Sequence, residues 1–73
     1  MSFQAKLQQE YQHDTRDSGV SMFEWMRSKV ASLYPNAVYN RRMAARLIAL
    51  EDKDLTEMDK NLLGRLGLEK VCN

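Results

Sequence analysis

The sequence predicts an all-α fold, a small bundle of three to four short helices in a single domain that spans residues 1–73. Apolar residues recur three and four positions apart over most of the chain, no stretch alternates apolar and polar residues as a strand would, and turn-forming residues separate the periodic segments. A chain this short buries only about 60% of the surface that its unfolded form exposes. We therefore expect a net stability of only a few kcal/mol.

The first expected helix covers about residues 2–14 and is mostly polar. Phe3, Leu7 and Tyr11 follow one another at intervals of four, which gives an apolar line narrower than the roughly 100° stripe of a core helix. We expect this helix either to dock along one edge of the bundle or to be loosely attached, leaving three helices to form the core. The residues that follow favour a turn around Gly19, which is free to adopt a positive φ.

The second expected helix covers residues 21–34 and is the most hydrophobic part of the chain. Ser21 and Glu24 match the capping-box pattern of a helix start. Pro35 lacks an amide hydrogen and disfavours helix in the residue before it, so the helix should end near Leu33. The face that we expect in the core carries Met22, Met26, Val30 and Leu33, widened by Phe23 and Trp25.

The third expected helix covers residues 36–50, with Asn36 as its N-cap. Its longest apolar stripe carries Tyr39, Met43, Leu47 and Leu50, extended to one side by Ala44 and Ile48. The same helix holds the only cluster of arginines in the chain. Arg42 and Arg46 lie four positions apart and are neighbours on the helix surface, whereas Arg41 points nearly the opposite way.

The fourth expected helix covers residues 56–66, and either Asp54 or Thr56 can cap it. Its apolar side carries Met58, Leu62, Leu63 and Leu66. Gly67 after the last apolar residue is typical of a Schellman stop. We expect residues 69–73 to form a flexible tail.

Composition excludes several classes of site. Cys72 is the only cysteine and His13 the only histidine, so we expect no disulfide framework, no structural zinc, no other metal and no cofactor. The longest apolar run, Leu47 to Ala49, is far too short to cross a bilayer. The first ten residues lack the apolar core of a signal peptide. The sequence therefore predicts a cytoplasmic protein with no membrane partner.

Catalysis is not expected, and no catalytic residue is predicted. A nucleophile needs an activating base, and His13 lies in a polar segment between Gln12 and Asp14. The acids between residues 51 and 59 fall in an expected loop, where nothing would desolvate a carboxylate and raise its pKa. The three glycines are scattered and form no phosphate-binding loop.

The leading functional hypothesis is a small regulator or adaptor that acts by stoichiometric binding to another protein. Five methionines in 73 residues are many, and thioether side chains repack readily against varied partners. Aromatic residues bracket the Pro35 turn, and Trp, Tyr and Arg are the usual anchors of interfaces. The marginal core suggests a homodimer or a chain that its partner stabilises. The predicted partner-binding residues are Trp25, Tyr34, Tyr39, Arg42 and Arg46.

The alternative hypothesis is a transcriptional regulator that binds DNA as a helical dimer. The turn at Gly19 resembles that of a helix-turn-helix, which would make residues 21–33 the recognition helix. The contacts that this alternative predicts are Arg27, Lys29, Arg41, Arg42 and Arg46. A net charge of +1 and the acids that follow the arginines weigh against it. We instead expect Arg42 and Arg46 to pair with acids within the fold or across a dimer.

Overall fold

The computed structural model describes residues 2–71 and consists of α-helices joined by short connections. The four helices are α1 (Phe3–Thr15), α2 (Met22–Leu33), α3 (Ala37–Ala49) and α4 (Glu57–Arg65). Short 3-10 helices occupy three connections: η1 (Arg16–Ser18), η2 (Asp52–Asp54) and η3 (Glu69–Val71). The described part of the chain contains no strand, and the predicted small all-α bundle is confirmed.

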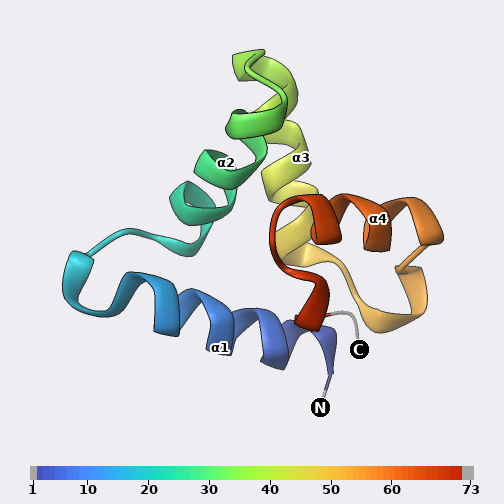
Figure 1. Cartoon of the computed structure of the whole chain (residues 1–73), viewed down its shortest axis with the longest axis horizontal. Helices are drawn as coiled ribbons and strands as arrows, with labels where there is room; N and C mark the ends of the chain where they lie inside the picture. The colour runs from blue at the N-terminus through green and yellow to red at the C-terminus, as the bar shows by residue number, and fades with distance from the viewer. Residues whose placement is uncertain (1, 72–73) are drawn as a thin grey trace.

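The helices α2 and α3 lie side by side as a hairpin, which forms the largest contact between elements in the molecule. Figure 1 shows α1 crossing below the open end of this hairpin and α4 lying beside the lower part of α3. After α4 the chain turns back, and η3 packs against both α4 and α1. The two ends of the described chain therefore meet on one side of the bundle.

Side-chain caps fix where all four described α-helices begin. The sequence predicts those of α2, α3 and α4, but not that of α1, where the Ser2 hydroxyl accepts from the Ala5 amide. The Ser21 hydroxyl accepts a hydrogen bond from the Glu24 amide at the start of α2. The Asn36 side chain accepts one from the third amide of α3. Thr56, rather than the alternative Asp54, caps α4, where it forms a reciprocal capping box with Asp59. The predicted helix bounds are accordingly correct to within one residue.

A Schellman motif ends α4, as the sequence predicts. Gly67 has a φ of 81°, its amide donates to the carbonyl of Gly64 at 3.0 Å, and the Leu68 amide donates to the carbonyl of Leu63 at 2.8 Å. These are the two hydrogen bonds that define the motif. Leu68 is fully buried, so the turn carries the chain back into the core.

The prediction of a flexible tail at residues 69–73 is wrong for the first three of these residues. These form η3, in which Val71 is only 3% exposed. Lys70 also forms an ion pair with a glutamate of α1. The buried apolar side chain holds this segment against the bundle, a feature that a five-residue stretch with few apolar residues does not reveal. Residues 72 and 73 lie outside the described part of the chain.

The first helix is packed into the bundle, so the loosely attached alternative does not describe this structure. Phe3 and Leu7 are buried despite the narrowness of the apolar line. The Asp52 carboxylate accepts a hydrogen bond from the Phe3 amide at 2.7 Å, and Gln4 donates to the carbonyl of Leu50. A carboxylate at a helix N-terminus also interacts favourably with the helix dipole. The acidic loop after α3 therefore anchors the start of α1.

The core is drawn from every α-helix and from the segment after α4. The fully buried large side chains are Leu7, Met26, Val30, Leu47, Leu63 and Leu68. Two residues of the predicted apolar stripes lie on the surface: Tyr39 is 42% exposed and Met58 is 81% exposed. Their neighbours Asn40 and Asp59 are buried in their place. The inward faces of α3 and α4 thus include a polar residue each, while the predicted stripe residues that do lie in the core include Leu47, Leu50, Leu63 and Leu66.

Candidate protein-docking site

A shallow groove lies where the end of α2 meets α3 and α4. We call it the aromatic–methionine groove and define it by Tyr34, Tyr39, Met43, Met58, Leu62 and Arg65. Asp59 and Asn61 complete its lining, and its volume is about 240 Å³. The groove brings together two of the predicted partner-binding residues, Tyr34 and Tyr39. A third, Arg46, does not line the groove but binds Asp59, which does.

The two tyrosines form one wall of the groove. Their ring centroids are 5.1 Å apart and the ring planes meet at 64°, the edge-to-face arrangement that aromatic pairs prefer. The Arg65 guanidinium lies 5.8 Å from the centroid of the Tyr34 ring and donates a hydrogen bond of 3.1 Å to its hydroxyl. Met58 stands on the other side with most of its side chain in solvent. The wall is therefore aromatic, and its edge is cationic.

The position of Tyr34 follows from the proline beside it. Pro35 disfavours helix in the preceding residue, and Tyr34 adopts extended backbone angles, with a φ of −131° and a ψ of 90°. The Asn40 side chain donates a hydrogen bond of 3.3 Å to the Tyr34 carbonyl and so fixes the turn against the first part of α3. This arrangement brings the Tyr34 ring next to Tyr39, only five residues later in the sequence.

An ion pair between Arg46 and Asp59 sets the distance between α3 and α4. Both guanidinium Nη atoms reach the carboxylate, and the Nη2–Oδ2 distance is 3.1 Å. The Thr56 amide and hydroxyl also donate to Oδ2, at 3.1 and 3.0 Å. The hydrogen bond from Arg46 is the main cause that lowers the pKa of Asp59 to about 2. The predicted pairing of Arg46 with an acid is confirmed, and this pair supports one edge of the groove.

Trp25 is not part of the groove. It is only 7% exposed, and its ring packs edge-to-face on Tyr11 with the centroids 5.6 Å apart. The indole nitrogen donates a hydrogen bond of 3.1 Å to Asp14, and Lys29 lies 3.4 Å from the same carboxylate. Burial raises the pKa of Asp14, but Trp25 and Lys29 outweigh it and lower that pKa below its usual value. Trp25 therefore fastens α2 to α1 and leaves little exposed surface for the partner contact that the sequence predicts.

A larger groove of about 670 Å³ runs between the end of α1, α2 and the end of α4. Its charged groups are already paired with one another or with the fold. Asp14 holds Trp25 and Lys29, and Arg65, which lines both grooves, is bound to Tyr34. A small-molecule site needs a few polar groups that converge on the ligand. The larger groove thus offers a weaker case for a specific site than its size suggests.

The residues predicted to contact nucleic acid do not form one surface. Three of the five are paired with acids on different parts of the molecule: Arg27 with Glu24, Lys29 with Asp14 and Arg46 with Asp59. The predicted turn at Gly19 is present, with a φ of 76°, but α2, the recognition helix of that alternative, lies against α3 and carries core residues. Of the five, only Arg41 and Arg42 have no ion pair within residues 2–71, and both are exposed on α3.

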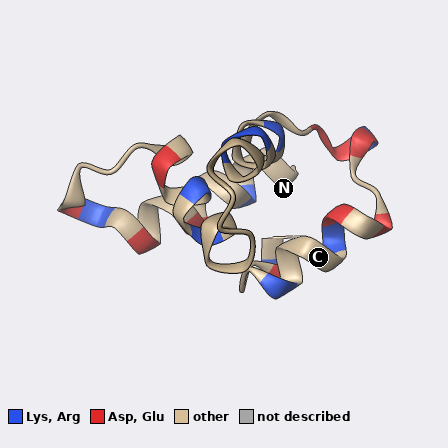
Figure 2. Ribbon diagram, turned by 90° about the horizontal axis from the view of Figure 1, so that it is seen from above, with Lys and Arg blue, Asp and Glu red and all other residues tan. Residues whose placement is uncertain are grey.

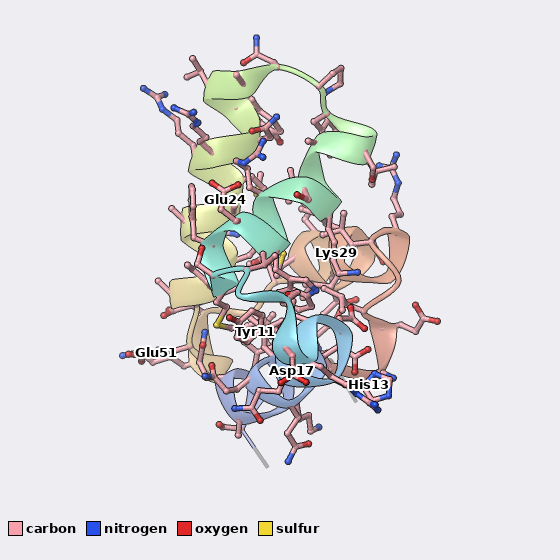
Figure 3. All side chains as sticks on the ribbon, turned by 90° about the vertical axis from the view of Figure 1, so that its left-hand side faces the viewer. Tyr11, His13, Asp17, Glu24, Lys29 and Glu51 are labelled. Atoms are coloured by element: carbon pink, nitrogen blue, oxygen red, sulfur yellow. The ribbon has the colours of Figure 1, made fainter. Side chains whose placement is uncertain are left out.

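Residues 2–71 contain neither a membrane-spanning helix nor a cluster of metal-binding side chains. No helix within residues 2–71 combines the length and the apolar composition needed to cross a bilayer. The described residues also hold no group of three or more histidine, cysteine or acidic side chains that could bind a metal ion. His13 is 70% exposed, with its Nδ1 atom 3.8 Å from Asp14. It projects from the surface at the end of α1 (Figure 3).

Four residues of the groove were missed by the predicted contact set: Met43, Met58, Leu62 and Arg65. The sequence places the first three on apolar helix faces, where the default expectation is core. These groove residues can be told from core residues by the polar residue beside them, Asn40 or Asp59, which lies on the buried face of the helix. Arg65 carries no such signal, because its partner Tyr34 is 31 residues away.

No family model, curated protein or solved structure matches this chain.

Proposed function

We propose that this protein is a small adaptor or regulator that acts by stoichiometric protein binding, and that the aromatic–methionine groove is its docking surface. The main support for the proposal is that apolar side chains, a kind usually found in the core, are exposed together in one groove. Met58 is 81% exposed and Tyr39 42% exposed, and both line the same groove. Exposed apolar patches mark interaction sites, and Tyr, Met and Arg are enriched at interfaces.

The dimensions of the groove favour a protein side chain over a small molecule. Its volume of about 240 Å³ lies below the range of roughly 300–1,000 Å³ that is typical of small-molecule pockets. The open side suits a large apolar side chain inserted from a partner's helix or loop. The flexible thioethers of Met43 and Met58 can adjust to the shape of that side chain.

The charge at the edge of the groove defines the partner further. Arg65 is held over Tyr34, and the one acid in the lining, Asp59, is neutralised by Arg46. The edge therefore keeps a net positive charge. We infer that the partner segment presents a large apolar side chain with a carboxylate beside it, since the carboxylate would lie next to the Arg65 guanidinium. Arginine pairs particularly well with carboxylates.

Affinity purification with a groove variant tests the proposal. In Tyr39→Ser/Met58→Ser both replaced side chains are exposed, so the fold should persist, as circular dichroism will check. The matched control is Gln8→Ser/Gln12→Ser, which changes two exposed residues of α1. We expect the wild type and the control to retain one stoichiometric partner after nuclease treatment, and the groove variant to lose it by about tenfold or more. Equal recovery by the groove variant would contradict the proposal.

Nucleic-acid binding is the second candidate function, and Arg41 and Arg42 are the observation in its favour. Helix α3 contains three arginines and no acid. A salt titration with a DNA duplex separates the two candidates, because log affinity should fall with log salt at a slope of about −0.9 for each phosphate neutralised. Arg41→Ala/Arg42→Ala should then reduce that slope by about two. The groove variant should leave it unchanged.

A further inference from the structure

The outer face of α3 is a second surface, separate from the aromatic–methionine groove. On a helix of 3.6 residues per turn, Val38, Arg42, Ala45 and Ala49 share one direction, with Arg41 beside them. All five are exposed, and the direction is opposite to that of the buried residues Asn40, Ala44 and Leu47. We call this the α3 outer face. Val38 is 62% exposed, and the two alanines leave its centre flat and apolar.

Charge is divided between the two ends of this face. The end near the start of α3 carries Arg41 and Arg42, which have no ion pair within residues 2–71. The end of α3 leads into the acidic loop Glu51–Asp54, whose side chains are exposed. Figure 2 shows this acidic segment at one side of the molecule, and Figure 3 shows Glu51 projecting outward on the α3 side. One end of the surface is thus basic and the other acidic.

We propose that the α3 outer face binds a second copy of this chain, with the two α3 helices antiparallel about a two-fold axis. In such an arrangement a residue later in one α3 faces a residue earlier in the other. We place the two-fold axis so that Ala45 of one copy faces Ala49 of the other. The same register brings Arg42 of one copy beside the Glu51–Asp54 loop of the other, twice over by symmetry. Small side chains at the axis let two helices approach closely.

The observations favour a second copy over nucleic acid on this face. The acids at the far end of the face would repel a phosphate backbone laid along it but complement the basic end of a second copy. Within the monomer, Glu51 has only a 3.6 Å contact with Lys53, and both side chains are largely exposed. One helix face provides less than the roughly 800 Å² per partner of a standard interface. We therefore expect a weak dimer that forms and dissociates in the micromolar range.

Sedimentation equilibrium of the full chain, from low-micromolar to near-millimolar concentration, tests this arrangement through a charge swap. The basic-end variant is Arg41→Glu/Arg42→Glu and the acidic-end variant is Glu51→Lys/Asp54→Lys. Each alone places like charges opposite each other at both ends and should weaken dimerisation by about a hundredfold. An equimolar mixture restores opposite charges at both ends, so it should form a heterodimer at least as tight as the wild-type dimer.

A matched control separates the effect of charge position from that of net charge. Arg16→Glu/Lys60→Glu makes the same change in net charge on other elements and should leave dimerisation unchanged, as should the groove variant Tyr39→Ser/Met58→Ser. Circular dichroism checks that each variant is folded. The inference is overturned if the wild type stays monomeric over the whole range, or if the mixture fails to associate. Monomeric wild type that binds a DNA duplex through Arg41 and Arg42 would assign the face to nucleic acid instead.

Discussion

Replacing Asp59 by asparagine removes the charge that joins α3 to α4 while it keeps the shape of the side chain. Asp59 is only 5% exposed, whereas the Arg46 side chain is 45% exposed, so solvent screens this ion pair in part. Its pKa is lowered from 3.8 to about 2. A difference of one pKa unit corresponds to about 1.36 kcal/mol, so the charged form contributes about 2 kcal/mol to stability at neutral pH. For a domain of this size, such a loss lowers Tm by about 10 °C.

The pH dependence of this effect has a definite sign. The pKa of Asp59 is lower in the folded than in the unfolded state, so its contribution is present in full above the unfolded value. It is lost as the pH falls from about 4 toward about 2. The difference in unfolding free energy between wild type and Asp59→Asn should therefore be constant near neutral pH, shrink through this window and nearly vanish at its lower end.

Urea denaturation followed by circular dichroism at a series of pH values measures this difference. Glu57→Gln is a matched control, because Glu57 lies in the same helical turn but is 87% exposed. Its ion pair with Lys60 is long at 3.7 Å and therefore weak. The control should lose much less stability than Asp59→Asn. Arg46→Met combined with Asp59→Asn should lose less than the sum of the two single changes. An equal loss in Glu57→Gln, or a loss in Asp59→Asn that does not depend on pH, would refute this account of the ion pair.

Four further substitutions test how the fold is held together, each by urea or thermal denaturation. Asp52→Asn removes the carboxylate that accepts from the α1 amide and should cost about 1 kcal/mol through the helix dipole, a loss that high salt reduces. Gly67→Ala should destabilise the fold by about 1 kcal/mol, a cost that comes from the positive φ alone because no atom would clash with the new Cβ. Gly64→Ala, inside α4, should instead stabilise the fold by up to about 1 kcal/mol. Trp25→Phe keeps most of the packing but removes the hydrogen bond to Asp14, so it should cost about 1–3 kcal/mol.

Local signals in the sequence account for the helices and their ends. Ser21, Asn36 and Thr56 each have a short polar side chain that can satisfy a free amide of the next turn, and each does so. Gly67 relieves the steric cost of a positive φ where the chain reverses. These features depend only on residues within about five positions of one another, so the sequence alone can predict them.

The orientation of the helices could not be predicted in the same way. Asp59 turns inward because Arg46, 13 residues earlier, binds its carboxylate. Asn40 turns inward with only its Nδ2 bonded, to the Tyr34 carbonyl beyond the turn, and its Oδ1 is buried without a hydrogen-bond partner in residues 2–71. With both residues turned inward, Tyr39 and Met58 are directed outward. Similarly, nothing near Asp52 in the sequence indicates that it accepts from the amide of Phe3, 49 residues earlier. The candidate site therefore arises from long-range pairings that a single sequence does not contain.

Photo-cross-linking from the groove is the most direct test of the central claim that this surface docks a protein. A photoreactive benzoylphenylalanine replaces Met58, which is 81% exposed, and in a second variant replaces Gln8, which is exposed on α1. Both variants are expressed in the native host and irradiated there. The account predicts one dominant protein adduct from position 58 that is absent from position 8. No adduct at position 58, or the same adducts from both positions, would contradict it.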